Sequence, residues 1–166
     1  MAIDIGRKML FFLVLCLTQA LVLNRMHLFG CATPLLYVYM TIIFPYRYPR
    51  WGVILWSFFL GLVIDFFSNT PGVVSASLTL VGAVQTGFFG LFVQRDAPEN
   101  IAPGVNSMGF FKFTFYAFVL VLLHCTLFFT LETFSFFNVI QWIKCIVGST
   151  AITLILILTI ESLRKK

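Results

Sequence analysis

The residues of this chain that could do chemistry are few, and the most unusual is a carboxylate inside an apolar segment. Asp65 lies in the stretch WGVILWSFFLGLVIDFFSNTPG, residues 51–72. Ser57, Gly61 and Asp65 recur at intervals of four, so they share one face of a helix. A charge exposed to lipid costs roughly 3 kcal/mol even on the gentler insertion scales. We therefore expect this face to contact protein or water, unless Asp65 ends its helix and reaches the headgroup water.

The sequence contains no recognisable catalytic set. It lacks the HExxH, GxSxG and glycine-rich phosphate-binding motifs. His27 and His124 belong to different depths of the predicted bundle and cannot share a metal ion. A lone histidine on an apolar helix, such as His124, is more often a packing residue than a ligand. Asp65 and Glu132 are too few for hydrolytic acid–base chemistry. We therefore predict a protein that is not an enzyme and has neither metal nor cofactor.

Composition bounds the class of protein. The 166 residues are 60% hydrophobic and 10% charged, whereas soluble domains carry about 25% charged residues. A soluble fold of this size could not bury so much apolar surface, so we predict one integral membrane domain over residues 1–166. No CxxC pair occurs, and the cysteines are expected to be small core residues. They are Cys16, Cys31, Cys125 and Cys145.

Apolar segments separated by breaker residues predict an all-α bundle of six transmembrane helices. Their expected bounds are 9–23, 28–44, 51–67, 73–93, 112–131 and 139–163. The first could imitate a signal peptide, but its apolar run continues past Ala20, which favours a retained helix. The second is the weakest, because its strictly apolar part, Leu35 to Phe44, is too short to span alone. Residues 94–111 form either a linker or a short interfacial segment.

The segment 73–93 carries a stripe of small residues. Its members are Ser75, Thr79, Gly82, Thr86 and Gly90, at intervals of three or four. In lipid, small residues let two helix backbones approach closely. The preceding helix is joined to this one by the Pro71–Gly72 turn, so we expect the stripe to pack against the Gly61 face. Gln85 lies near the stripe and could hydrogen-bond across it.

The basic residues indicate how the bundle is oriented. Lys and Arg stand at the ends of apolar segments, as orientation signals do, and no basic stripe with interleaved aromatics suggests nucleic-acid binding. With both termini in the cytoplasm, the cytoplasmic side holds Arg7, Lys8, Arg47, Arg50, Arg95, Lys112, Arg164, Lys165 and Lys166. The other side holds only Arg25 and Lys144. There, Asp65 or Glu132 could pair with Lys144.

One part of the chain resembles a known family. The run PLLYVYMTIIF, the basic loop YRYPRW and the stretch GVILWSFFLGLVIDFFSNTPGVVSASLTLVG are similar to the MreD family of small integral membrane proteins of the bacterial rod-shape system. The resemblance covers residues 34–90, about a third of the chain. It rests on Pro34, the basic loop, the Gly61-Leu62-x-x-Asp65 pattern and the Pro71–Gly72 turn. This turn departs from the usual Leu–Gly of the family.

The resemblance implies a scaffold in the bacterial cytoplasmic (inner) membrane. Family members serve cell-wall elongation, which builds peptidoglycan and sets cell shape. They work with MreC, a single-span protein, and within an assembly that includes the MreB filament, RodA and a class B penicillin-binding transpeptidase. The lipid bilayer is the remaining partner. Candidate structural or partner-binding residues are Gly61, Asp65, Pro71, Gly72, Gly82 and Gln85.

A second function remains open. The MreD family is similar in fold to the substrate-binding subunits of energy-coupling-factor vitamin transporters. This likeness would make the chain a solute-binding membrane subunit of a vitamin transporter, with an outward pocket of convergent polar groups. The first predicted helix, however, lacks the pair of small residues, spaced by four, with which such subunits dock to their partner.

Overall fold

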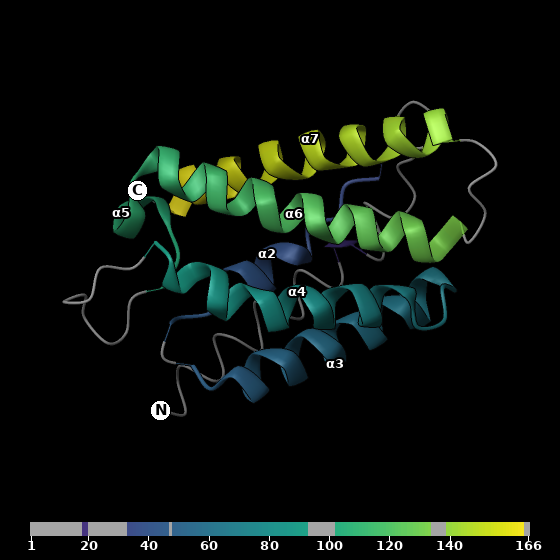
Figure 1. Ribbon diagram of the computed structural model, residues 1–166, viewed down its shortest axis with the longest axis horizontal. Coiled ribbons are helices and arrows are strands. Elements are labelled where there is room, and N and C mark those ends of the chain that lie inside the picture. Colours follow the sequence, from purple (N-terminus) through teal and green to yellow (C-terminus); the bar gives the residue numbers. More distant parts are fainter. Residues whose placement is uncertain (1–17, 20–32, 47, 93–101, 134–138, 165–166) are drawn as a thin grey trace.

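The computed structural model describes residues 18–19, 33–46, 48–92, 102–133 and 139–164, and over these ranges the fold is helical without strands. The helices are α2 (Val38–Ile42), α3 (Arg50–Ser68), α4 (Val73–Gly90), α5 (Val105–Met108), α6 (Phe110–Thr133) and α7 (Val139–Arg164) (Figure 1). The first predicted helix, 9–23, lies outside the described residues apart from 18–19, which are helical.

Four of the described helices are long and apolar enough to cross a membrane: α3, α4, α6 and α7. They are 18 to 25 residues long, which at the α-helical rise corresponds to roughly 27 to 38 Å and matches a hydrocarbon core about 30 Å thick. Each begins and ends within three residues of the bounds expected from the sequence. The described part of the chain is therefore that of a helical membrane protein.

The prediction of a continuous helix over 28–44 is wrong for the part that the structure describes. Thr33 to Leu35 have no regular structure, Leu36 and Tyr37 form a turn, and α2 has only five residues. The physical reason is that backbone N–H groups here donate to side chains of other helices instead of to the carbonyls one turn earlier. The N–H of Leu35 donates to Thr153 Oγ1 at 3.0 Å, and the N–H of Leu36 donates to Gln19 Oε1 at 3.1 Å.

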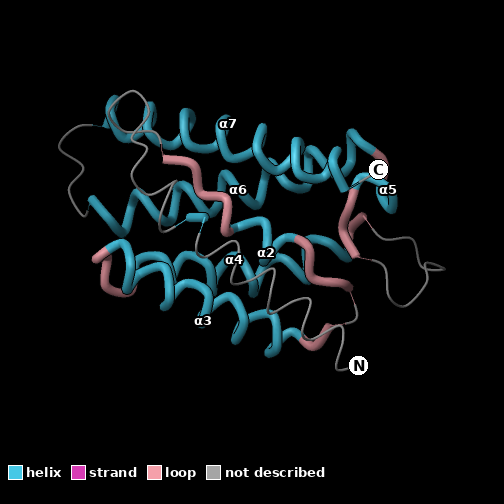
Figure 2. Tube along the Cα trace, turned by 180° about the vertical axis from the view of Figure 1, so that it is seen from behind, coloured by secondary structure: helices cyan, strands magenta, loops and turns pink. Residues whose placement is uncertain are grey.

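This non-helical stretch lies in the middle of the bundle. α3 and α4 form one antiparallel pair and α6 and α7 another, and α2 lies between the pairs in both views (Figures 1 and 2). Every residue from Pro34 to Ile42 is buried. Irregular backbone is tolerated at membrane depth only where protein satisfies its polar groups, and a central position provides that protein on every side.

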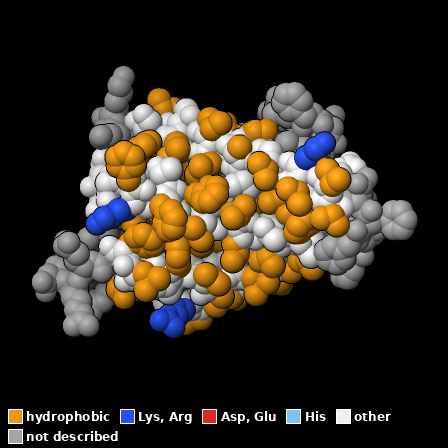
Figure 3. Space-filling model, turned by 45° about the horizontal axis from the view of Figure 1, so that its top comes forward, with side chains coloured by type: hydrophobic (Ala, Val, Ile, Leu, Met, Phe, Trp, Pro, Cys, Tyr) orange, Lys and Arg blue, Asp and Glu red, His pale blue; other side chains and the backbone are white. Residues whose placement is uncertain are grey.

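The surface of the bundle suits lipid. Figure 3 shows one face covered largely by hydrophobic side chains, with Lys and Arg towards its margins. Large exposed apolar residues are found on all four long helices, for example Phe66 (84% exposed) on α3 and Leu163 (70%) on α7. The interior is closed by aromatic side chains such as Tyr116, whose ring stacks on Phe88 at a centroid distance of 5.8 Å. This distribution is the one expected in a bilayer.

The polar connection 94–111 is ordered in its second half. Residues 94–101 lie outside the described residues, whereas Val105–Met108 form α5 and α6 begins at Phe110. Gly109 separates the two helices with φ +83°, a conformation that glycine adopts readily. Val105 and Met108 pack partly against the core. The end of this connection is therefore a short helix attached to the bundle, rather than a linker.

Candidate functional site

The α3–α4 hairpin contains most of the residues singled out from the sequence. α3 ends at Ser68, and Asn69 follows in the left-handed conformation, with φ 56°. Its N–H donates to the Asp65 carbonyl, which closes the last turn of the helix. Pro71 and Gly72 are exposed in the turn, and Gly72 has φ +85°. The turn thus needs a glycine for its backbone conformation, since a Cβ at Gly72 would meet no neighbouring atom.

The carboxylate of Asp65 caps the helix that follows its own. Oδ1 accepts a hydrogen bond from the Val74 N–H at 2.9 Å and one from the Thr70 hydroxyl at 3.1 Å. Oδ2 accepts one from the Ser75 N–H at 2.9 Å. The first turn of a helix has N–H groups without intrahelical partners, and Gly72, at the N-cap of α4, has no side chain to serve them. Asp65 supplies the missing acceptors from α3.

This arrangement explains how a carboxylate is accommodated in an apolar segment. Asp65 is 5% exposed. Its charge faces the positive end of the α4 dipole, an interaction worth about 0.3–1 kcal/mol at exposed sites and up to ~2 kcal/mol when partly buried. Of the two partners predicted for Lys144, Asp65 does not bond to it in the described part of the chain: its carboxylate bonds to Thr70, Val74 and Ser75, and the Lys144 side chain is exposed. Backbone dipoles replace the counter-ion.

Small residues let α3 and α4 touch along their length. A Cβ on Gly61 would lie 2.7 Å from the Ser75 nitrogen and also against its Cα. A Cβ on Gly82 would lie 2.7 Å from Ser57 Oγ. The close packing expected between the Gly61 face and the stripe on the next helix is therefore present within the chain. These glycines face the interior of the hairpin and not a surface open to a partner.

Gln85 bonds to the central segment instead of across the hairpin. Its Nε2 donates to the carbonyls of Phe44 at 3.1 Å and of Ile42 at 3.4 Å, and its Oε1 accepts from the Thr86 hydroxyl at 3.2 Å. The last carbonyls of a helix have no intrahelical donor. Gln85 therefore satisfies the C-terminal end of α2, with help from the Tyr116 hydroxyl, 3.4 Å from the Ile42 carbonyl.

A buried row on α7 holds the other side of the central segment, and the sequence reading missed it. Its members are Ser149, Thr153, Ile157 and Glu161, each at most 5% exposed. Ser149 Oγ accepts from the Thr33 N–H at 3.1 Å. Glu161 accepts from the Tyr39 hydroxyl at 2.7 Å and from the Val105 N–H at 3.1 Å. Their regular interval of four, which marks one helix face, was the signal that could have found them.

The basic residues of the described ranges divide between the two ends of the bundle. Arg50 begins α3, Lys112 lies in the first turn of α6 and Arg164 ends α7. Tyr46, before α3, contacts Gly90 at the end of α4, and Val105, before α6, bonds to Glu161 near the end of α7. The ring of Phe92, just after α4, meets that of Phe115 on α6 at 6.2 Å, so these helix ends lie on one side of the bundle. Lys144, near the start of α7, belongs to the opposite end. The other seven basic residues used to predict the orientation lie outside the described residues: Arg7, Lys8, Arg25, Arg47, Arg95, Lys165 and Lys166.

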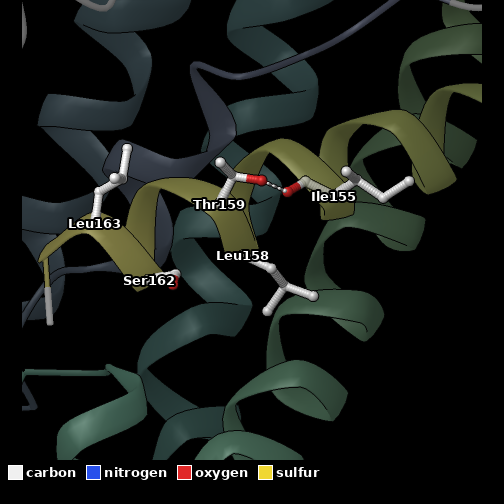
Figure 4. Close-up of a pocket in the computed structure, with 5 residues that line it drawn as sticks. All are labelled: Ile155, Leu158, Thr159, Ser162 and Leu163. Carbon is white, nitrogen blue, oxygen red and sulfur yellow. Dashed lines mark hydrogen bonds between the residues drawn. The ribbon is translucent and has the colours of Figure 1, made fainter.

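The other chemical features of the described residues are the distribution of possible metal ligands and a surface hollow. In the described ranges, no three His, Cys, Asp or Glu side chains are grouped to hold a metal ion. A hollow of about 370 Å³ lies on the surface of α7, lined by Ile155, Leu158, Thr159, Ser162 and Leu163 (Figure 4). The Thr159 hydroxyl donates to the Ile155 carbonyl at 2.8 Å, so this polar group is already used. The hollow includes none of the predicted site residues.

The fold and the site together define a helical membrane protein built on a capped hairpin. Searches of protein-family models, curated proteins and solved structures found no match for the chain.

Proposed function

We propose that this chain is a non-enzymatic scaffold of the cell-wall elongation complex in the bacterial cytoplasmic membrane, where it binds MreC. The proposal rests on the resemblance to the MreD family over residues 34–90. The observation that supports it best is the hairpin closed by Asp65, because three of the features that carry the resemblance have a joint structural purpose there. Asp65 caps α4, Gly61 admits Ser75, and Gly72 makes the turn.

The hairpin leaves one face of α3 for a partner helix. The small residues are used between α3 and α4, so the partner contact that we propose lies on the opposite side. That side presents a row of exposed apolar side chains: Trp51, Leu55, Phe58, Phe59, Leu62, Phe66 and Phe67. In lipid, two helices associate through van der Waals packing, and a helix held by its neighbour along its whole length presents a fixed surface for such packing. MreC's single transmembrane helix is the occupant we propose.

The same proposal places the start of α3 and the end of α7 at the cytoplasmic side. Its support is the positive-inside rule, since Arg50, Lys112 and Arg164 mark one end of the bundle. Both termini would then be cytoplasmic and the α3–α4 turn would face outward. MreB, RodA and the transpeptidase would be reached through the complex.

Co-purification with MreC from detergent-solubilised membranes tests this function. We expect the parent chain to retain MreC, and the variant Phe59→Ala with Leu62→Ala to retain at least tenfold less. A matched variant on α7, Val147→Ala with Ile155→Ala, removes exposed apolar side chains of the other hairpin and should retain MreC normally. Failure of the parent chain to retain MreC, or equal loss in both variants, contradicts the proposal.

The solute-binding alternative has one observation in its favour. The central segment from Thr33 to Tyr37 is non-helical and surrounded by polar side chains, and broken helices near the middle of the membrane form the solute sites of many transporters. Native mass spectrometry of the purified chain separates the two functions. A small organic molecule retained in stoichiometric amount, without MreC, supports the transport subunit, and its absence supports the scaffold.

A further inference from the structure

The interior of the bundle contains polar side-chain atoms that no described residue satisfies. His124 Nδ1, Thr150 Oγ1 and Thr33 Oγ1 are buried atoms without a hydrogen-bond partner in the described part of the chain. His124 is 0% and Thr150 3% exposed. Elsewhere the interior is well satisfied, as the contacts of Asp65 and Gln85 show. Buried polar groups of native proteins almost always have a partner, either protein or ordered water.

These atoms belong to one layer between the central segment, α6 and α7. The Thr33 N–H donates to Ser149 Oγ at 3.1 Å, which brings Thr33 to the turn of α7 that contains Thr150. On the other side, the Tyr37 hydroxyl of the central segment lies 3.0 Å from His124 Nε2 on α6, and α6 packs against α7. The central segment therefore contacts both helices at the turns that contain His124 and Thr150.

The contact between Tyr37 and His124 limits which molecule can bind at His124 Nδ1. The Tyr37 hydroxyl lies 3.0 Å from His124 Nε2, and the two rings meet edge to face at 5.3 Å. In a neutral imidazole one nitrogen donates and the other accepts. If Tyr37 donates to Nε2, then Nδ1 carries the proton and needs an acceptor. If Nε2 donates, then Nδ1 needs a donor. Water can both donate and accept, so it satisfies either case. A metal ion satisfies only the second case and an anion only the first.

We propose that ordered water is bound inside the bundle in this layer, hydrogen-bonded to His124 Nδ1 and to the hydroxyls of Thr150 and Thr33. The residues named are neutral, which favours a neutral occupant in a membrane interior. Globular proteins hold about one buried water per 27 residues, at sites with several polar partners, and this layer offers hydroxyls from two elements and an imidazole from a third. The inference is independent of the proposed function.

Solid-state NMR of the full chain in phosphatidylethanolamine and phosphatidylglycerol vesicles tests the inference. The variant His27→Asn makes His124 the sole histidine, so ¹⁵N-histidine labelling reports on one ring. We expect a neutral imidazole with a hydrogen-bonded Nδ1. Magnetisation transfer from water should reach this ring at least fivefold faster than it reaches the backbone amides of Leu120 and Val121, which are buried on the same helix.

A pair of substitutions on α7 sharpens the test. Thr150→Val keeps the shape but removes one hydroxyl of the layer, and should shift the Nδ1 resonance and reduce the transfer from water at least twofold. Thr159→Val, on the exposed side of α7, should change neither quantity. Absence of water transfer to the ring in the parent overturns the inference. Transfer from a bound organic molecule instead of water also overturns it, and this outcome leaves the test with MreC unaffected.

Discussion

The carboxylate of Asp65 on α3 accepts a hydrogen bond from the backbone N–H of Ser75 on α4, 2.9 Å away, and so joins two membrane-length helices through a single side chain. The bond lies next to the closest backbone approach of the pair, where Gly61 meets Ser75. Cap and contact therefore support each other. The carboxylate fixes the start of α4, and the glycine allows α4 to lie close enough to be capped.

Replacing Asp65 by Leu should destabilise the chain substantially. The N–H groups of Val74 and Ser75 would remain buried without an acceptor, and each buried unsatisfied group costs about 1–3 kcal/mol. We expect a loss of about 2–4 kcal/mol in the free energy of unfolding, measured by chemical denaturation in detergent. Asp65→Asn keeps one acceptor oxygen and should lose less. Leu62→Ala, on the exposed side of α3, serves as the control, and a loss as large as that of Asp65→Leu would contradict the role given to the cap.

Three glycine-to-alanine substitutions should rank by the atoms that the new methyl group meets. At Gly61 the Cβ meets backbone of Ser75, which cannot rotate away, so α3 and α4 must separate. At Gly82 it meets Ser57 Oγ, a side chain able to turn, so the cost should be smaller. At Gly87 nothing lies within 4 Å, and alanine should stabilise by about 0.5–1 kcal/mol through helix propensity. Thermal unfolding in detergent measures this order, and an equal loss at Gly61 and Gly87 would refute it.

Gln85→Leu should weaken the attachment of the central segment. It removes the donor to the Phe44 and Ile42 carbonyls, and we expect a loss of about 1–3 kcal/mol in the free energy of unfolding. Tyr116→Phe removes the 3.4 Å bond to the Ile42 carbonyl and should lose under about 1 kcal/mol. The same denaturation assay compares them. The reverse order would show that the phenol, and not the amide, holds the end of α2.

Glu161→Ala should release α5 without unfolding the bundle. The carboxylate accepts from the Val105 N–H and the Tyr39 hydroxyl, whereas α5 has only four residues and little structure of its own. We expect amide hydrogen exchange over Val105–Gly109 to accelerate at least tenfold, while exchange in the middle of α6 is unchanged. Ser162→Ala, one residue further on the exposed side of α7, is the matched control. Unchanged exchange at Val105 would mean that other contacts hold α5.

Local patterns in the sequence were sufficient for the hairpin. The interval of four from Ser57 to Asp65 and the small residues of 73–93 predicted two faces that pack together, and they do. The acceptor role of Asp65 was not predicted, because capping from a preceding helix depends on how the turn folds back. The spacing showed only that the carboxylate needed polar neighbours.

The central segment could not be predicted in the same way. Leu35 to Phe44 are mostly apolar, and a short apolar run does not show whether its backbone is helical. What opens the helix is contact with residues far away in the chain: Thr153 lies 118 positions from Leu35, and His124 lies 87 from Tyr37. Helical periodicity carries no information on such pairs. The regular row on α7 can be recognised in the sequence, but the groups of the central segment to which it bonds cannot.

The most direct test of the capped hairpin is amide hydrogen exchange at Val74 and Ser75 in lipid bilayers, because these two N–H groups donate to Asp65. We predict slow exchange in the parent chain and exchange at least tenfold faster in Asp65→Leu, with Asp65→Asn between them. The Ala76 amide, whose acceptor is the Gly72 carbonyl, provides the internal reference. If Val74 and Ser75 stay as protected in Asp65→Leu as in the parent, the carboxylate does not close the hairpin.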